Sequence, residues 1–301
     1  MARYLVTGGA GFIGSHLVDA LLASGQQVVV LDDFSTGKEA NLPPGIALRR
    51  GDVADPATVR QAMAGTDGCF HLAAIASVAR GNEDWPGTHR VNVGGTVAVL
   101  DAARAAGGVP VVYASSAAIY GDTGEAVAHE ALRPAPRTAY GADKLGSELH
   151  AAVGALVHGV PSIGLRFFNV YGPRQDPSSP YSGVISIFAR RAAEGLGVTI
   201  HGDGEQTRDF VFVADVVAHL LAAMRRASNR TGADVFNVCT GRATSILQLA
   251  TLLGACPVTH AAARAGDIRH SRGDPRRAAE ALGVAATVEL AAGLARLRAA
   301  S

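Results

Sequence analysis

Residues 4–14 have the sequence Tyr-Leu-Val-Thr-Gly-Gly-Ala-Gly-Phe-Ile-Gly, a short apolar run that leads into a glycine-rich loop. The apolar run predicts a β-strand, and the apolar spacing that follows predicts a helix over 13–23. Gly8, Gly11 and Gly14 suit a tight turn, close approach of a pyrophosphate to the backbone, and close helix packing, each of which excludes a side chain. The start of the helix would offer free N–H groups to phosphate. The stretch therefore predicts the first unit of a dinucleotide-binding fold.

Apolar runs and helix-like spacing alternate after this loop. Strands are predicted over 28–31, 46–48, 69–72, 111–115 and 162–167, and helices over 56–64, 88–106 and 140–158. Nearly continuous apolar strands separated by helices are typical of a parallel sheet that is covered on both faces. We therefore expect an α/β fold with a doubly wound parallel (Rossmann) sheet over residues 1–168. A smaller C-terminal α/β domain that binds the substrate is expected over 169–301, with part of about 205–225 returning to the first domain.

The composition argues against several classes of protein. The chain has 301 residues, 48% of them hydrophobic, which is enough for a buried core, and its formal net charge of +1 predicts no general attraction to nucleic acid or membranes. Three cysteines without C-x-x-C spacing and ten histidines without ligand spacing predict neither a disulfide framework nor a metal site. The chain enters its first strand at once and has no apolar run of about 18 residues. We therefore expect a cytoplasmic protein.

Two acidic residues at the end of the second predicted strand indicate which nucleotide would bind. Asp32 follows the glycine loop by about 20 residues, where a carboxylate can hold ribose hydroxyls. Together, Asp32 and Asp33 would repel the extra 2′-phosphate of NADP, which favours NAD. For Asp33, a solvent-exposed helix cap is an equally good interpretation.

Tyr140 and Lys144 are candidates for general acid/base chemistry. The chain has only two lysines, Lys38 and Lys144, against 25 arginines. Positions i and i+4 share one face of a helix, and a compact ammonium near the phenol of Tyr140 would favour its ionised form. The phenol, with an ordinary pKa of about 10, would then be a usable base near neutral pH. The alternative is a surface pair without a chemical role.

Ser115 and Ser116 stand where the predicted strand 111–115 ends. Ligands of doubly wound sheets bind at the carboxyl ends of the strands, so Ser116 is a candidate catalytic hydroxyl. A hydroxyl that ties down the end of the strand is the alternative for Ser116, and for Ser115 we favour that structural role.

Several motifs in the same order carry a resemblance to a known family. They are the segment 111–121 with Tyr140 and Lys144 after it, and the segments 165–174, 202–210 and 264–267. With them, the chain resembles extended short-chain dehydrogenase/reductases, specifically the UDP-glucose 4-epimerase group, over nearly its whole length. The resemblance implies an NAD-dependent enzyme that inverts carbon 4 of a UDP-hexose, of the UDP-glucose/UDP-galactose type, by transient oxidation. It also implies a homodimer that is formed through the helices at 88–106 and 140–158.

The resemblance also implies a role for individual residues. Ser116 would bond the reacting oxygen of the sugar, Tyr140 would be the base, and Lys144 would hold the cofactor ribose. The implied cofactor-binding residues are Gly8, Gly11, Phe12, Ile13, Gly14, Asp32, Asp33, Ser35, Asp52, Val53, Leu72, Ala73, Ala74, Asn92, Tyr140, Lys144 and Phe167. The implied substrate-binding residues are Ser116, Asn169, Arg208, Arg264 and Asp267.

Other outcomes of the same chemistry are alternatives to epimerisation of a plain hexose. Related dehydratases and decarboxylases usually carry an acidic residue after the catalytic hydroxyl, where this chain has Ala117 and Ala118. 4-Epimerisation of UDP-N-acetylglucosamine or UDP-glucuronate stays open. Ser271 matches a position that is small where N-acetyl groups are accepted, whereas Asp176 departs from the arginine usual in glucuronate epimerases. An NAD-dependent nucleotide-sugar reductase and a non-catalytic NAD-sensing protein are the remaining alternatives.

Overall fold

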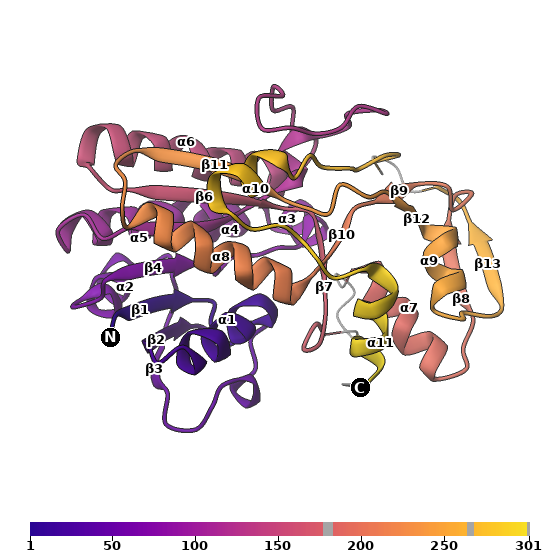
Figure 1. The fold of residues 1–301 in the computed structure, drawn as a ribbon, viewed down its shortest axis with the longest axis horizontal. Coiled ribbons are helices and arrows are strands. Elements are labelled where there is room, and N and C mark those ends of the chain that lie inside the picture. Colours follow the sequence, from indigo (N-terminus) through magenta and orange to yellow (C-terminus); the bar gives the residue numbers. More distant parts are fainter. Residues whose placement is uncertain (177–182, 264–267, 300–301) are drawn as a thin grey trace.

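The computed structural model describes residues 1–176, 183–263 and 268–299 and is built around a seven-stranded sheet (Figure 1). The strand order is β11-β6-β5-β4-β1-β2-β3. Its strands are β1 (Arg3–Thr7), β2 (Gln27–Asp32), β3 (Ala47–Arg50), β4 (Gly68–His71), β5 (Val111–Ser116), β6 (Ser162–Phe167) and β11 (Ala233–Val238). Every pairing within this sheet is parallel. The doubly wound parallel sheet that the sequence predicts is therefore confirmed.

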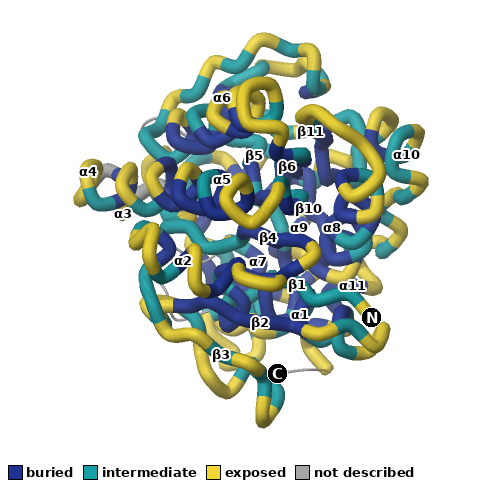
Figure 2. Tube along the Cα trace, turned by 90° about the vertical axis from the view of Figure 1, so that its left-hand side faces the viewer, coloured by how far each residue is buried: buried dark blue, intermediate teal, exposed yellow. Residues whose placement is uncertain are grey.

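Helices cover both faces of the sheet. They are α1 (Phe12–Ala23) and α8 (Val213–Ala227) on one face, and α2 (Pro56–Met63), α5 (Gly95–Ala105) and α6 (Ala139–His158) on the other. Successive residues of a strand enter opposite cores: Val28 and Val30 join the core beneath α1 and α8, and Val29 and Leu31 join the other core. This two-sided burial explains why the strands are unbroken apolar runs. In Figure 2 the buried residues, in dark blue, follow the strands through the middle of the molecule.

Shorter elements form a second group beside the sheet, with a hydrophobic core of their own. They are β7 (Asn169–Tyr171), α7 (Val184–Ala193), β8 (Val198–His201), β9 (Thr207–Arg208), β10 (Phe210–Phe212), β12 (Thr244–Ser245), α9 (Ile246–Leu252), β13 (Val258–Ala261) and α11 (Leu290–Ala299). The remaining helix, α10 (Arg276–Leu282), packs on β11 and α8 of the large sheet instead. Two-stranded sheets pair β10 with β7, β12 with β9 and β13 with β8. Figure 1 shows α7, α9, β8 and β13 together at one side of the molecule.

The division of the chain at residue 168 stays a prediction. Two elements that come after it lie against the large sheet or within it, and one of them, α8, overlaps the stretch at about 205–225 that was expected to return. Both α8 and β11 come after that residue, yet α8 packs on β5 and β6, and β11 pairs with β6 along its whole length. Strand β11 was not predicted from the sequence. Its sequence, Ala-Asp-Val-Phe-Asn-Val, contains two polar residues that weaken the apolar signal.

The helix predicted over 88–106 is interrupted. The structure has α4 (Trp85–His89), a π-helical turn η2 (Arg90–Gly94), and then α5, with α3 (Val78–Glu83) before them. Asn92 lies in the π-helical turn and is buried, and its side-chain amide bonds both backbone groups of Ile75, at 2.8 Å and 3.2 Å. Such π-helical turns are often found at functional sites. None of the helices within the described residues is long and apolar enough to cross a membrane.

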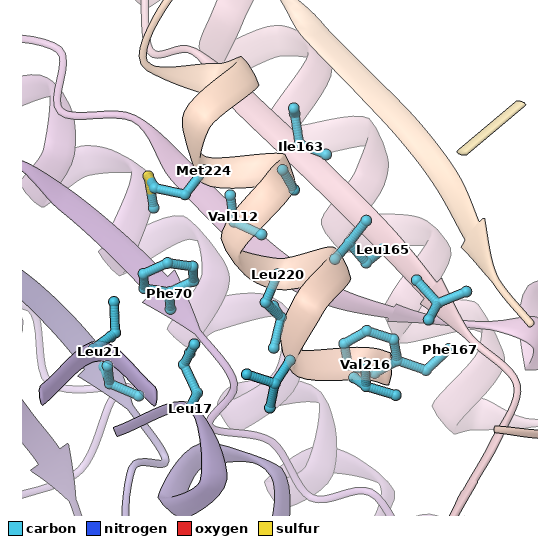
Figure 3. Packing of buried hydrophobic residues seen from close by; sticks show 14 of the residues in the cluster. Leu17, Leu21, Phe70, Val112, Ile163, Leu165, Phe167, Val216, Leu220 and Met224 are labelled. Carbon is cyan, nitrogen blue, oxygen red and sulfur yellow. The ribbon is translucent and has the colours of Figure 1, made fainter. Parts of the chain in front are cut away.

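The core beneath α1 and α8 supplies a test of the fold. Figure 3 shows Leu220 of α8 in the middle of this core, with Leu17 of α1 and Leu165 of β6 around it, and all three side chains are fully buried. We expect Leu220→Ala to lower the free energy of unfolding by about 2–5 kcal/mol, because it removes buried methyl groups and leaves a cavity. Urea unfolding measures this change. Leu196→Ala, at a position that is 46% exposed, is the control; an equal loss in both variants would contradict the described core.

Candidate active site

The glycine loop between β1 and α1 has little room for side chains. Gly8 has φ +70°, and a Cβ there would lie 2.7 Å from the backbone nitrogen of Ala73. A Cβ at Gly14 would lie 2.1 Å from the carbonyl oxygen of Gly8, whereas one at Gly11 would have only that same oxygen within 4 Å, at 3.2 Å. No side chain caps the N-terminus of α1. Protein packing therefore demands glycine at positions 8 and 14, while the space beside Gly11 is left for a ligand to approach.

Two carboxylates at the end of β2 shape the next part of the cleft. Asp32 is buried and accepts hydrogen bonds from the backbone N–H groups of Ala10 and Phe34, each at 2.9 Å. Burial raises the pKa of the Asp32 carboxyl group, and these two hydrogen bonds oppose that rise. Asp33 is exposed and accepts bonds from the N–H and the hydroxyl of Ser35 at 2.9 Å and 2.7 Å. It does not cap a helix, so the helix-cap interpretation of Asp33 is wrong.

A cleft of about 580 Å³ runs from the glycine loop to the carboxyl ends of β5 and β6. Of the predicted cofactor-binding residues, those that line it are Gly8, Gly11, Phe12, Ile13, Gly14, Asp32, Asp33, Ser35, Asp52, Val53, Leu72, Ala73, Ala74, Tyr140, Lys144 and Phe167. Asn92 is not among the lining residues, and it lies behind the wall that Ile75 forms. Arg80, Arg90 and Gln175 also line the cleft and were not predicted from the sequence. Arg90 is held there by its ion pair with Asp52 at 2.7 Å, and Gln175 by a hydrogen bond that its amide donates to the carbonyl of Val170 at 3.3 Å.

Ser116, Tyr140 and Lys144 meet at the end of this cleft. Ser116 is the last residue of β5, and its hydroxyl accepts a hydrogen bond from the N–H of Ala118 at 3.1 Å, which starts the short helix η3 (Ala117–Tyr120). Thr138 caps the first turn of α6, where Tyr140 stands. The Lys144 ammonium lies 5.7 Å from the centre of the Tyr140 ring and donates to the carbonyl of Ala114 at 2.9 Å. The structure therefore brings the three predicted catalytic residues together.

The protonation of these groups is controlled mainly by burial. Burial raises the pKa of the Tyr140 phenol, and a hydrogen bond with Ser116 opposes that rise. Burial lowers the pKa of Lys144 to about 8, and the charge of Asp143 opposes this change. Without bound ligands, the pKa of the Tyr140 phenol is therefore raised, and the lowering by Lys144 that we expected from the sequence is not found. Desolvation disfavours both the phenolate and the ammonium, so bound ligands would have to supply the compensating charge.

A buried ion pair between Arg166 and Glu148 lies next to the end of β5, where Ser115 and Ser116 stand. The Arg166 guanidinium of β6 contacts both carboxylate oxygens of Glu148 on α6, at 2.9 Å and 2.7 Å. The Ser115 hydroxyl donates to the same carboxylate at 2.5 Å, as the structural interpretation of Ser115 expects. Arg166 also donates to the hydroxyl of Tyr120, which donates to Asn237 of β11. The pair therefore joins β5, β6, α6 and β11 around the residue next to Ser116.

A second, smaller pocket of about 230 Å³ opens on the other side of Ser116 and Tyr140. Both residues line the cleft and this pocket, as do Phe167, Phe168 and Asn169. The rest of the pocket is lined by Ala117, Ala118, Tyr120, Gly121, Thr123, Ala128, Arg208, Ile268, His270, Ser271 and Arg272. Of the predicted substrate ligands, Ser116, Asn169 and Arg208 therefore lie together, and Arg264 and Asp267 fall outside the described residues. The sequence gives no signal for the contributions of Thr123 and His270, because both are loop residues that lie just outside the motifs 111–121 and 264–267.

Comparison with known proteins gives consistent results. A family model described as "NAD dependent epimerase/dehydratase family" matches residues 4–239. A UDP-glucose 4-epimerase of Mycolicibacterium smegmatis is 40% identical over 307 aligned residues, covering 98% of this chain and 96% of that protein.

Solved structures agree with these sequence matches. The UDP-glucose 4-epimerase of Thermotoga maritima, solved with UDP-glucose, superposes with a TM-score of 0.94 at 36% identity, covering 99% of this chain and 98% of that chain. MoeE5, solved with UDP-glucuronic acid and NAD, gives a TM-score of 0.87 at 37% identity, covering 99% and 98% of the two chains.

Removal of one partner of the buried ion pair tests its role. Glu148→Gln should lower the free energy of unfolding by about 3–5 kcal/mol, because it leaves the Arg166 charge buried without its counter-charge. The double variant Glu148→Gln with Arg166→Met should recover most of that loss, since no buried charge is then left uncompensated. Urea unfolding measures both values. Additive losses in the double variant would show that the two charges do not interact.

Proposed function

Because the chain belongs to the NAD dependent epimerase/dehydratase family, we propose that it is an NAD-dependent 4-epimerase of a UDP-hexose, of the UDP-glucose/UDP-galactose type. The observation that carries this proposal is the position of Ser116 and Tyr140, which line both the long cleft and the smaller pocket. A nucleotide cofactor in the cleft and a sugar in the pocket would meet at these two side chains. Relatives named for this reaction align over almost the entire chain.

The cleft suits NAD. The glycine loop and the uncapped N-terminus of α1 would receive the pyrophosphate, and Asp32 and Asp33 favour a ribose without a 2′-phosphate. Lys144 would hold the ribose next to the nicotinamide. Bound NAD supplies a reversible hydride acceptor for carbon 4 of the sugar.

The residues of the chain handle the proton and the oxygen of the sugar. Tyr140 takes the proton from the 4-hydroxyl during oxidation and returns it during reduction, as a general base and then a general acid. Ser116 would donate the one proton of its hydroxyl to the same oxygen, in place of its hydrogen bond with Tyr140, while its own oxygen still accepts from Ala118. A 4-keto sugar that turns within the pocket presents its opposite face, so the returned hydride inverts the configuration.

The lining of the sugar pocket favours epimerisation over dehydration. Dehydration needs a further acid/base group that reaches carbons 5 and 6. Among the described residues, the pocket has no aspartate or glutamate in its lining, and Ala117 and Ala118 occupy the positions after Ser116. An NAD sensor is less well supported, since it would not need the complete Ser116, Tyr140 and Lys144 group beside a sugar-sized pocket. A net reductase would use the same three residues, and the relatives named for epimerisation favour the epimerase over it.

The residues that line the pocket also bear on which UDP-hexose the enzyme accepts. Arg208 lines the pocket, where a guanidinium suits the diphosphate of a nucleotide sugar, and we assign Arg264 and Asp267 the diphosphate and uridine ribose. Ser271 also lines the pocket and is small. This favours acceptance of UDP-N-acetylglucosamine as a second substrate. UDP-glucuronate is the weaker alternative, because Asp176 stands where glucuronate epimerases usually have an arginine, and it pairs with Lys38 at 3.1 Å.

The exposed faces of α5 and α6 support a homodimer. Large apolar side chains are exposed there at Val97, Leu149, Val153, Leu156 and Val157. Contiguous exposed apolar residues of this kind mark interaction sites, and two helices from each subunit would make a four-helix bundle. We further propose a cytoplasmic enzyme that binds neither nucleic acid nor membranes, in keeping with the net charge of +1.

The reaction can be tested by NMR analysis of the product. We expect UDP-glucose to be converted to its 4-epimer without added NAD, because the enzyme must retain its cofactor through the catalytic cycle. Tyr140→Phe should lower turnover by about 10²–10⁴-fold, because it removes the general base. The same variant should keep its bound NAD, which absorbance after denaturation measures. No epimer from the wild-type protein with UDP-glucose, UDP-N-acetylglucosamine or UDP-glucuronate would contradict the proposal.

The dimer can be tested by light scattering. We expect the wild-type protein to have twice its chain mass of 30.7 kDa. Leu156→Asp, at a position that is 87% exposed, should give a folded monomer because it places a charge in an apolar interface. Leu196→Asp is the control at an exposed leucine outside these helices and should stay dimeric. A monomeric wild-type protein would contradict the proposed homodimer.

A further inference from the structure

We propose that Asp209 positions the walls of the sugar pocket and thereby sets the affinity for the nucleotide sugar. It stands between β9 and β10, next to Arg208, and lines neither the cleft nor the smaller pocket. Asp209 is therefore a positioning residue that touches neither substrate nor cofactor. The inference rests on the proposed function, because it needs a nucleotide sugar in that pocket, but the binding step can be measured without turnover.

The smaller pocket is formed by stretches that lie far apart in the sequence. Phe168 and Asn169 lie at the junction of β6 and β7, Arg208 belongs to β9, and the stretch 268–272 comes before α10. Such a pocket keeps its shape only if these stretches are fixed to one another. A site whose walls are fixed in advance binds more tightly, since less ordering is needed when the ligand arrives.

Asp209 joins all of these stretches. It follows Arg208 in the chain, and its backbone carbonyl accepts a hydrogen bond from the N–H of Asn169 at 2.9 Å. Its carboxylate Oδ2 accepts from the N–H of Gly273 at 3.3 Å. At the other end of the same stretch, the Arg208 guanidinium donates to the carbonyl of Ile268 at 2.7 Å. Residues 208 and 209 therefore hold the stretch 268–273 at both ends.

Gly273 packs directly against the pocket. A Cβ at this position would lie 2.6 Å from Cζ of Phe168 and 2.5 Å from the Cys239 thiol sulfur. The N–H of Ala128, another lining residue, donates to the carbonyl of Arg272 at 2.9 Å. A shift of the backbone at Gly273 would therefore move lining residues that come from several stretches.

The carboxylate of Asp209 is fully buried and has donors at both of its oxygens. Oδ1 accepts from the N–H and the hydroxyl of Thr240 at 2.8 Å and 2.7 Å, and Oδ2 accepts from the N–H of Gly241 at 2.9 Å as well as from Gly273. An ionised carboxylate accepts at both oxygens, whereas an asparagine would turn its NH₂ group toward one pair of these donors. The carboxylate is therefore needed to hold the loop at 240–241 and Gly273 together.

Asp215 of α8 provides a matched control. It is also buried, and its carboxylate accepts from the hydroxyl of Thr287 at 3.2 Å and from the N–H of Val288 at 3.0 Å. None of these three residues lines the sugar pocket. We therefore expect Asp215→Asn to lower stability without changing the pocket.

Calorimetric titration with UDP tests the proposal on purified protein with the cofactor it retains. UDP carries the diphosphate but no hexose, so no turnover occurs. We expect Asp209→Asn to raise the Kd of UDP by about tenfold, the size of effect that one hydrogen bond to a charged group supplies. Asp209→Ser, whose side chain is too short to reach both pairs of donors, should weaken binding at least as much. Asp215→Asn should leave the Kd unchanged.

The amount of bound NAD separates a local effect from a loss of the fold. Both Asp209 variants should keep their NAD, measured by absorbance after denaturation, because the glycine loop and Lys144 belong to the large sheet and its helices. An unchanged Kd of UDP in both variants would overturn the proposal. So would an equal rise of the Kd in Asp215→Asn, or loss of NAD or of folded protein in both Asp209 variants, since Asp209 would then support the whole fold.

Activity gives a second readout. In Asp209→Asn the KM for UDP-glucose should rise by the same factor as the Kd of UDP, whereas kcat should change much less because Ser116, Tyr140 and the bound NAD keep their places. Wild-type protein that binds UDP but epimerises no UDP-hexose would refute the proposed function and leave the role of Asp209 intact. Wild-type protein that binds no UDP would contradict both.

Discussion

Glu148 and Arg166 form a buried ion pair at the point where β5, β6 and α6 meet, and the site depends on its geometry. A pair of this kind compensates the cost of desolvation only when the remaining hydrogen-bonding groups are also satisfied. Ser115 and Tyr120 provide those bonds here. Because Glu148 follows Lys144 by one turn of α6, the pair sets how α6 is rotated against β5. The positions of Tyr140 and Lys144 relative to Ser116 follow from that rotation.

The same burial that orders the site also makes charge costly within it. Burial raises the pKa of Tyr140 and lowers that of Lys144. The protein alone therefore favours the protonated, neutral phenol of Tyr140 and disfavours the charged ammonium of Lys144. A general acid/base in such a site can be switched by the charges of bound ligands, since a cationic nicotinamide would favour the phenolate. Such a ligand-dependent acid/base suits the proposed reaction, in which Tyr140 must first accept a proton and then return it while the same substrate stays bound.

Much of this arrangement could be predicted from the sequence because it depends on local signals. The glycine loop, the apolar strands and the Tyr140-to-Lys144 spacing all lie within short segments, and the structure agrees with them. β11 could not be predicted, since Asp234 and Asn237 interrupt its apolar pattern and its place beside β6 is chosen by packing. In the protein alone, burial raises the pKa of Tyr140, whereas its spacing from Lys144 predicts a lowering. Spacing identifies neighbouring charges but gives no measure of desolvation.

In the proposed reaction, carbon 4 of the sugar is oxidised by loss of a hydride and is then reduced when the same hydride returns. The most direct measurement follows UDP-glucose that carries deuterium at carbon 4 through turnover, with mass spectrometry and NMR of the product. The account predicts that the 4-epimer keeps the deuterium at carbon 4, with no net change in the absorbance of bound NAD. Loss of the label to solvent, or product formed only with stoichiometric consumption of added cofactor, would contradict it.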